Sequence, residues 1–103
     1  ERVEAVRIKD VNNGSEKTLK CDGVFIFVGI TPNTEIVKGI LNLDDNNYII
    51  ADGEMRTSVD GIFACGDVRK KSLRQVVTAA GEGATAAVSA RAYVDRIKGV
   101  EYK

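Results

Sequence analysis

The chain has 103 residues, with 15 basic and 15 acidic side chains and therefore no net charge. This length suits one small domain, and the balanced charge without a basic patch predicts neither a nucleic-acid partner nor a membrane partner. No apolar run reaches membrane-spanning length, and two cysteines without a disulfide framework fit a reducing, cytoplasmic setting.

The first predicted element is an antiparallel hairpin. Val6 and Ile8 alternate with basic residues, and Leu19 and Cys21 alternate with polar ones. The Asn12-Asn13-Gly14-Ser15 stretch between them is a turn signal. Period-two alternation is typical of a strand with one solvated face, so the sequence predicts a solvated hairpin.

A continuous apolar run, Val24 to Val28, follows the hairpin. Its length and composition predict a strand that is buried on both faces. The stretch from Gly29 to Asn33, with a Pro32-Asn33 turn, then ends it.

The middle of the chain alternates short elements with turns. A short helix interrupted by Gly39 is predicted for Glu35 to Leu43, because Ile36, Val37, Ile40 and Leu41 share one face. Strands are predicted at Tyr48 to Ala51 and Ile62 to Cys65, with turns at Asp52-Gly53 and Asp60-Gly61.

The last predicted element is a helix from about Gln75 to Lys98, ended by Gly99. Its interior is rich in alanine and glycine, and each interior glycine costs about 1 kcal/mol relative to alanine. Such residues are tolerated where a neighbouring backbone or a flat cofactor comes close. Tight packing of the helix on a sheet explains most of them, and a cofactor concerns mainly the first turn.

The candidate site lies where the strand ending at Cys65 runs into Gly66-Asp67 and, after a basic loop, into the helix start. Sheets of α/β proteins bind ligands at the carboxyl ends of their strands, and helix N-termini favour anionic groups. Asp67 could equally be a structural turn residue that accepts hydrogen bonds from nearby backbone amides.

Three segments together resemble the C-terminal part of a bacterial-type thioredoxin reductase: Val24 to Thr34, Thr57 to Val68 and Arg74 to Gly83. The similarity runs through nearly the whole chain in the same order. It implies an α/β fold, a partial FAD/NAD(P)-binding domain of Rossmann-like three-layer type preceded by an antiparallel hairpin. Residues 1–30 would be the last strands of the NADPH-binding domain, and residues 31–103 the second half of the FAD-binding domain.

The same resemblance implies FAD as the cofactor at the candidate site. Gly66 would let the cofactor approach, and Asp67 would accept a hydrogen bond from a ribityl hydroxyl. Arg74, Gln75 and Val76 would lie at the pyrimidine edge of the flavin ring, where a helix N-terminus favours the negative charge that gathers on reduction. A competing interpretation is a Ser72-Gln75 capping box, in which Gln75 is occupied by the backbone.

Other polar residues near the site are expected to be structural. Arg69, Lys70 and Lys71 are interpreted as a solvated loop rather than as phosphate ligands. Cys65 is expected to be a buried, inert thiol. No catalytic residue and no metal ligand is assigned.

Two motifs of such a reductase are absent from the chain. It has no Gly-x-Gly-x-x-Gly loop for a nucleotide and no Cys-x-x-Cys pair for disulfide chemistry. We therefore expect NADPH to be held mainly outside this chain, and the isolated chain to be inactive and to bind FAD weakly. The first residue, Glu1 rather than Met, suggests a piece of something longer.

The resemblance implies an enzyme that passes hydride from NADPH to FAD and then to a disulfide. A thioredoxin-like substrate, the remaining N-terminal portion of the reductase and a second copy in a homodimer are the implied partners. One alternative is a non-catalytic α/β module that self-associates or needs a partner. Another is part of a ferredoxin or flavodoxin-NADP reductase of the same fold. A Cys-x-x-Cys in the preceding portion would imply disulfide reduction and so exclude this alternative.

Overall fold

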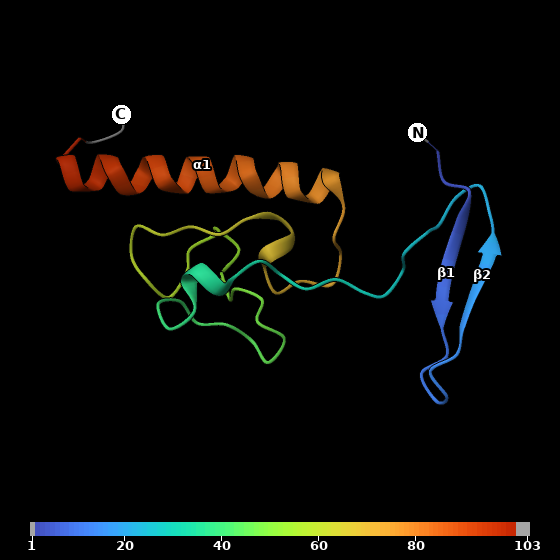
Figure 1. The fold of residues 1–103 in the computed structure, drawn as a ribbon. Helices are drawn as coiled ribbons and strands as arrows, with labels where there is room; N and C mark the ends of the chain where they lie inside the picture. The colour runs from blue at the N-terminus through green and yellow to red at the C-terminus, as the bar shows by residue number, and fades with distance from the viewer. Residues whose placement is uncertain (1, 101–103) are drawn as a thin grey trace.

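An antiparallel hairpin and a long helix stand at the two ends of the chain, joined by a mostly irregular middle (Figure 1). The computed structural model describes residues 2–100. In chain order the elements are the strands β1 (Ala5–Lys9) and β2 (Glu16–Lys20), the short 3-10 helices η1 (Glu35–Val37) and η2 (Gly66–Val68), and the helix α1 (Val76–Lys98).

The hairpin is confirmed. Strands β1 and β2 pair in antiparallel register from Ala5 with Lys20 to Lys9 with Glu16. Asp10 organises the turn, because its carboxylate accepts a hydrogen bond from the Asn12 N–H at 2.8 Å and its carbonyl accepts one from the Gly14 N–H at 2.9 Å. Gly14 adopts φ 74°, a left-handed conformation that glycine reaches without steric cost.

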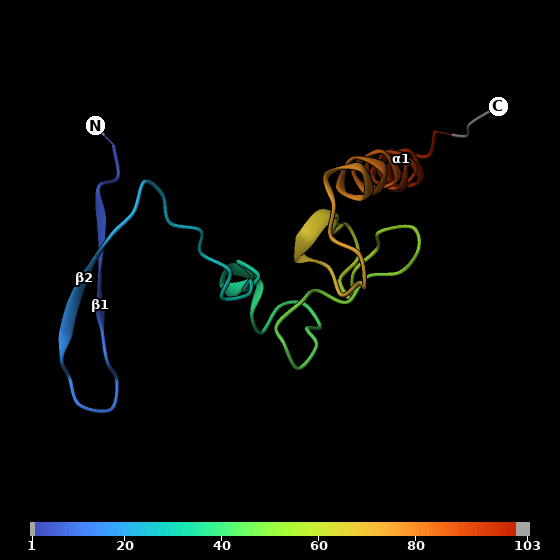
Figure 2. The ribbon, with the colours of Figure 1, turned by 90° about the vertical axis from the view of Figure 1, so that its right-hand side faces the viewer.

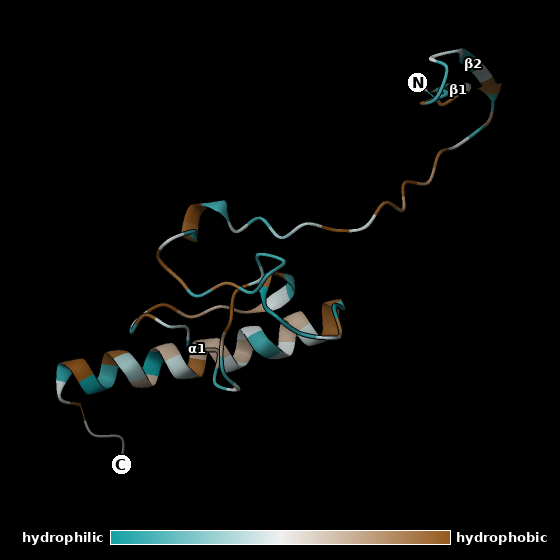
Figure 3. Ribbon diagram, turned by 90° about the horizontal axis from the view of Figure 1, so that it is seen from below, coloured by the Kyte–Doolittle hydropathy of each residue, from teal (hydrophilic) through white to brown (hydrophobic). Residues whose placement is uncertain are grey.

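The strand predicted for Val24 to Val28 does not form. The segment is extended but unpaired, and the Phe25 and Phe27 side chains are 87% and 90% exposed. A strand buried on both faces needs neighbouring strands and covering layers, and within residues 2–100 none lies beside this segment. Figure 3 shows it as the brown stretch between the hairpin and the rest of the molecule.

The hairpin stands apart from the remainder of the chain (Figure 2). Among the described elements, β1 contacts β2 and η2 contacts α1, and no other pair touches. The radius of gyration is 21.0 Å, whereas a compact domain of this length has about 13 Å. The body that carries the site is therefore formed by the part of the chain after the linker.

The core of this body is small. Leu41, Ile49 and Ala64 are buried together, and partly buried apolar side chains pack around them: Val37, Leu43, Ala51 and Val68. Ile49 is central, because its N–H donates to the Val68 carbonyl at 2.8 Å and its own carbonyl accepts from the Lys70 N–H at 2.9 Å.

The predicted short helix from Glu35 to Leu43 is wrong in extent. Only the three residues of η1 are helical, and Lys38 is already extended. Gly39 then adopts φ 78°, outside the right-handed helical region, so the helix cannot continue. As a result Ile36 and Ile40 face solvent while Leu41 enters the core.

The two strands predicted at Tyr48 to Ala51 and Ile62 to Cys65 are also wrong as strands. Each is reduced to isolated bridges, Ile49 with Leu43 and Arg69, and Phe63 with Arg56. Residues with left-handed φ values lie beside these bridges and turn the chain away after a single pair: Asn47, Met55 and Gly66. The turns predicted around Asp52-Gly53 and Asp60-Gly61 are present as backbone hydrogen bonds, Met55 N–H to Asp52 and Ile62 N–H to Val59.

The long helix is confirmed as α1. It begins at Val76 after the N-cap Gln75 and ends at Gly99, which adopts φ 65° and donates its N–H to the Arg96 carbonyl. Arg96 and Lys98 place positive charge in the last turn, where the helix dipole favours it. No helix within residues 2–100 is long and apolar enough to cross a membrane.

Candidate functional site

The candidate site is the tight turn η2, which lies against the first turns of α1. Cys65 is extended, and Gly66 turns the chain with φ 80°. A Cβ at Gly66 would lie 3.8 Å from the Ala79 Cβ of α1, which is ordinary contact, so the positive φ is what favours glycine here. The turn then closes by a hydrogen bond from the Arg69 N–H to the Gly66 carbonyl at 3.2 Å.

Asp67 directs its carboxylate outward from this turn. The side chain is 63% exposed, and its nearest charged partner is the Lys71 ammonium, with 4.0 Å between Nζ and Oδ1. Within residues 2–100 no backbone amide donates to the Asp67 carboxylate, so the turn does not use it in the way a structural turn residue would. Asp67 borders a cleft of about 250 Å³ that is also lined by Ile30, Thr31, Pro32, Asn33, Tyr48 and Val68.

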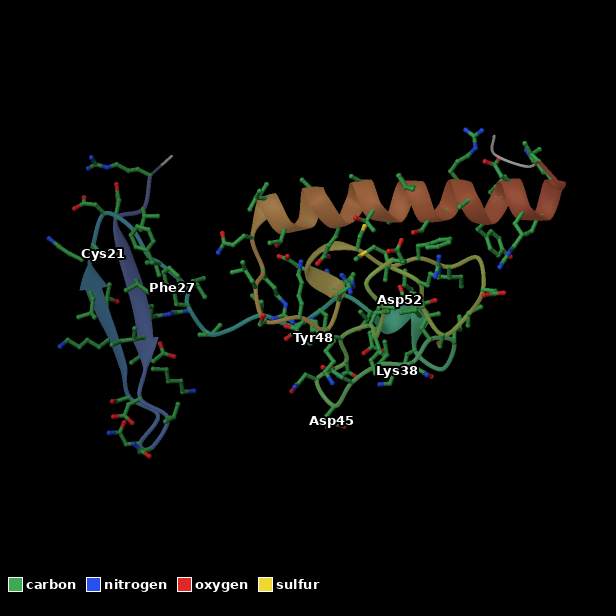
Figure 4. All side chains as sticks on the ribbon, turned by 180° about the vertical axis from the view of Figure 1, so that it is seen from behind. Cys21, Phe27, Lys38, Asp45, Tyr48 and Asp52 are labelled. Carbon is green, nitrogen blue, oxygen red and sulfur yellow. The ribbon has the colours of Figure 1, made fainter. Side chains whose placement is uncertain are left out.

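Arg74 holds the backbone of the same turn. Its Nε donates to the Asp67 carbonyl and its Nη2 to the Arg69 carbonyl, both at 3.3 Å. The guanidinium carbon lies 3.9 Å from the centroid of the Tyr48 ring, a cation–π contact. Tyr48 is labelled in Figure 4. The Arg74 side chain therefore supports the loop from the side of α1.

Gln75 and Val76 form the exposed start of α1. The Gln75 N–H donates to the Thr78 hydroxyl at 3.2 Å, and that hydroxyl donates to the Gln75 carbonyl at 2.8 Å. The alternative of a Ser72-Gln75 capping box is therefore wrong, because Gln75 is itself the N-cap, three residues after Ser72, and Thr78 is the capping partner. The first amides of a helix have no intrahelical acceptor, so this end favours anionic groups.

The structure brings three of the five candidate residues into one contact group. Gly66 and Asp67 are consecutive in η2, and the Arg74 side chain bonds their loop. Gln75 and Val76 follow Arg74 directly at the helix start, but their side chains face solvent. The site is thus a turn and a helix N-terminus that are tied together by Arg74.

The loop after η2 is not solvated, contrary to the interpretation of Arg69, Lys70 and Lys71. Of these three residues, only Lys70 is exposed. The Arg69 guanidinium donates to the carbonyls of Ala51 and Asp52, and Nη1 lies 3.1 Å from the Glu82 carboxylate. Lys71 turns inward to the same carboxylate, with 3.2 Å between Nζ and Oε1.

Glu82, in the second turn of α1, links these groups. Its Oε2 accepts the Gly66 N–H at 2.7 Å, while Oε1 faces Arg69 and Lys71. Burial by itself raises the pKa of Glu82, but the Gly66 hydrogen bond and the two cations outweigh it and hold the pKa below its ordinary value. The carboxylate is therefore charged at neutral pH.

No sequence motif points to Glu82, although its position in the chain carries a signal. Glu82 and Asp95 are the only acidic residues of α1, and Glu82 stands between two glycines in its alanine-rich half. A lone carboxylate on a small-sided face that packs inward requires a cationic partner. The basic loop eleven residues earlier in the chain supplies it.

Cys65 is exposed, so the prediction of a buried thiol is wrong. Neighbouring residues of an extended segment point to opposite sides, and only the side of Ala64 is covered by the core. Within residues 2–100 no group of side chains could hold a metal ion.

Asp67, which borders the cleft, and the nearby start of α1 have the chemistry to meet part of a flavin nucleotide. An outward carboxylate suits a sugar-like hydroxyl chain, and a helix N-terminus suits an electron-rich ring edge. The volume of about 250 Å³ is below the 300 to 1,000 Å³ typical of complete small-molecule sites. A cleft of this size would enclose only part of such a molecule.

Comparison with known proteins identifies relatives over nearly the whole chain. A family model described as pyridine nucleotide-disulphide oxidoreductase matches residues 1–83. A thioredoxin reductase of Treponema pallidum is 48% identical over 97 residues, which cover 94% of this chain and 31% of that protein. One of Listeria monocytogenes is 49% identical over 100 residues, covering 94% of this chain and 30% of that protein.

Solved structures give the same result. A thioredoxin reductase of Streptococcus pyogenes matches with a TM-score of 0.71 and 44% identity, over 92% of this chain and 31% of that one. One of Lactococcus lactis matches with a TM-score of 0.70 and 42% identity, over 90% of this chain and 31% of that one. The chain spans just under a third of the length of these relatives. The resemblance to thioredoxin reductases and the α/β, partial FAD/NAD(P)-binding fold are thereby confirmed.

Proposed function

Because this chain belongs to the pyridine nucleotide-disulphide oxidoreductase family, we propose that it supplies the flavin-holding segment of a thioredoxin reductase. The observation that carries this proposal is the turn η2, which presents the outward carboxylate of Asp67 beside the N-terminus of α1. The relatives named thioredoxin reductase support the choice of reductase over a ferredoxin or flavodoxin-NADP reductase.

In the proposed reaction two electrons and a proton pass from NADPH to the disulfide of a thioredoxin-like protein, which becomes a dithiol after taking a further proton from solvent. FAD, when bound, supplies a ring that can accept a hydride from NADPH and return the electrons to a disulfide. This chain holds no Cys-x-x-Cys and no nucleotide-binding glycine loop. Its own role is to bind and orient.

Each candidate residue has a separate task in this role. Gly66 lets the cofactor come close to the backbone, and the Asp67 carboxylate accepts a hydrogen bond from a ribityl hydroxyl. Arg74 fixes the loop through the Asp67 and Arg69 carbonyls. Gln75 and Val76 place the helix N-terminus at the pyrimidine edge of the ring, where positive potential stabilises the charge of the reduced ring.

The proposal extends to organisation and partners. Residues 1–30 end the NADPH-binding domain and residues 31–103 form the second half of the FAD-binding domain, in a homodimeric cytoplasmic enzyme. The separation of the hairpin from the body that carries η2 and α1 supports a boundary between them. The remaining N-terminal portion of the reductase supplies the nucleotide loops and the redox dithiol.

A second candidate is a non-catalytic module that needs a partner. The exposed apolar run around Phe25 and Phe27 favours this second function when the chain is present without the rest of a reductase. Such a run is stable in water only when it is covered.

Substitution of Asp67 and Gln75 in the FAD-loaded reductase tests the proposed function. Asp67→Ala removes the acceptor for the ribityl chain, and we expect weaker FAD retention by about 1.5 to 3 kcal/mol, the value of one charge-assisted hydrogen bond. Gln75→Ala should leave FAD bound and instead alter the reduction potential or the rate of flavin reduction by NADPH. Bound flavin absorbance and stopped-flow reduction measure the two effects.

Asp60→Ala is the matched control for these variants. The Asp60 carboxylate is also outward, 91% exposed, but pairs with Arg96 at the far end of α1. It should retain FAD and reduce at the parental rate. If Asp67→Ala and Gln75→Ala behave like this control, both residues are structural and the site assignment is wrong.

A further inference from the structure

Lys71 has two carboxylates within reach, and their distances differ. Its Nζ lies 3.2 Å from Oε1 of Glu82 and 4.0 Å from Oδ1 of Asp67. Its side chain is largely buried, so its charge needs a close partner. Glu82 is the closer of the two and is itself only 16% exposed.

Glu82 also contacts the residues on both sides of Asp67, the backbone on one side and a side chain on the other. Its Oε2 accepts the N–H of Gly66, the residue before Asp67. Its Oε1 faces Arg69, two residues after Asp67, at 3.1 Å. The Glu82 carboxylate thus contacts the turn η2 on both sides of Asp67.

We propose that Glu82 is a positioning residue for the cofactor site: it holds Lys71 away from Asp67 and so keeps the Asp67 carboxylate free to accept a hydroxyl of the flavin nucleotide. This inference rests on the proposed function, because it assumes that Asp67 meets the cofactor. When Glu82 loses its charge, Lys71 turns to the next carboxylate and the Asp67 acceptor is occupied. The other charged group that faces Glu82 is Arg69, which also donates to the carbonyls of Ala51 and Asp52.

The charge of Glu82 is maintained by the same contacts. The Gly66 hydrogen bond and the two cations outweigh the effect of burial, so the pKa of Glu82 is lowered and the carboxylate competes for Lys71 throughout the neutral range.

Four variants of the FAD-loaded reductase test this competition: Glu82→Gln, Glu82→Asp, Lys71→Met and the double variant Glu82→Gln/Lys71→Met. Glutamine keeps the shape of the side chain and an oxygen for the Gly66 N–H but removes the charge. We expect E82Q to weaken FAD binding about tenfold, near the lower value of one charge-assisted hydrogen bond. E82D keeps the charge and should bind FAD more tightly than E82Q.

The double variant separates competition from loss of structure. Methionine in place of Lys71 removes the cation that would occupy Asp67, so the double variant should bind FAD as tightly as K71M alone, within about threefold, a coupling that a double-mutant cycle detects. It also leaves no unpaired ammonium, so it is expected to fold even if E82Q does not. A double variant that binds FAD as weakly as E82Q, or one that fails to bind it, overturns the proposal.

Asp95→Asn is the matched control on the same helix. Asp95 is buried and paired within α1 to Arg91 at 2.7 Å, far along the helix from η2. It should lower the melting temperature without changing the FAD dissociation constant. The positioning role is contradicted if E82Q leaves the FAD affinity unchanged. It is also contradicted if E82Q changes the affinity no more than D95N does.

Asp67→Ala distinguishes the two proposals. If D67A binds FAD as the parent does, Asp67 is not at the cofactor and the proposed function of the site fails. If D67A loses FAD while E82Q retains it, the site stands and only the role of Glu82 is wrong.

Discussion

At the residue scale, Glu82 links α1 to the turn η2 and to the basic loop that follows it. It joins the Gly66 amide, Arg69 and Lys71, which come from a loop 11 to 16 residues earlier in the chain. Arg69 is buried and Lys71 is largely buried, and the ionised carboxylate offsets part of the desolvation of both cations. Local stability is therefore linked to pH.

The sign of this linkage gives a prediction for the chain. The folded-state pKa of Glu82 is lowered, so its contribution is complete above the unfolded value of about 4.3 and is lost as pH falls through the folded value. Glu82→Gln should cost on the order of 1 to 2 kcal/mol of unfolding free energy at pH 7. Denaturant titrations from pH 7 to pH 3 should show the difference in unfolding free energy between parent and variant shrinking below about pH 4.3. A difference that stays constant over this range would contradict the prediction.

At the element scale, α1 packs on the irregular body through two regions. Near its start it meets η2, and near its end the Tyr93 ring meets the edge of Phe63, with 6.2 Å between ring centroids. Gly61 lies beneath this ring. A Cβ there would be 2.9 Å from the Tyr93 hydroxyl oxygen, so the close contact requires glycine.

Two glycine substitutions separate backbone strain from this packing. Gly61 and Gly39 both have left-handed φ values, 84° and 78°, but a Cβ at Gly39 meets nothing within 4 Å. Alanine at either position should cost about 1 to 2 kcal/mol for the left-handed backbone. Gly61→Ala should cost more and alter the near-ultraviolet circular dichroism of Tyr93, because the ring must leave Phe63. Equal losses of unfolding free energy in the two variants would refute this account of the packing.

At the scale of the whole molecule, the chain leaves much apolar surface uncovered. Its radius of gyration of 21.0 Å reflects a hairpin and a body joined by an extended apolar linker. Phe25 and Phe27 lie two residues apart, and both side chains are almost fully exposed. Figure 4 shows Phe27 on this linker. An unpaired apolar segment recruits a second chain.

We therefore expect the chain on its own to self-associate through residues 24–28. Phe25→Lys/Phe27→Lys should shift the mass measured by light scattering towards the monomer. Val11→Lys is the matched control, because Val11 is 95% exposed but lies in the hairpin turn. A parent chain that is already a monodisperse monomer would contradict this prediction. So would a Val11→Lys variant that dissociates as much as the double phenylalanine variant.

The elements with strong local signals were determined by the sequence alone. Alternating residues and an Asn-Gly turn predict the hairpin, and small apolar residues ended by Gly99 predict α1, because contacts within a few residues decide both. The order of Gly66, Asp67 and the helix start is likewise visible in the sequence. Only the structure decided the rest: Gly39 and Met55 redirect the chain, Thr78 caps Gln75, and Glu82 draws Lys71 and Arg69 inward. The turn at Gly39 and the Thr78 cap are local, but residue type alone does not specify them. The contacts of Glu82 form only when α1 packs on the basic loop, because burying a charge makes a partner obligatory and no local pattern specifies which residue that partner is.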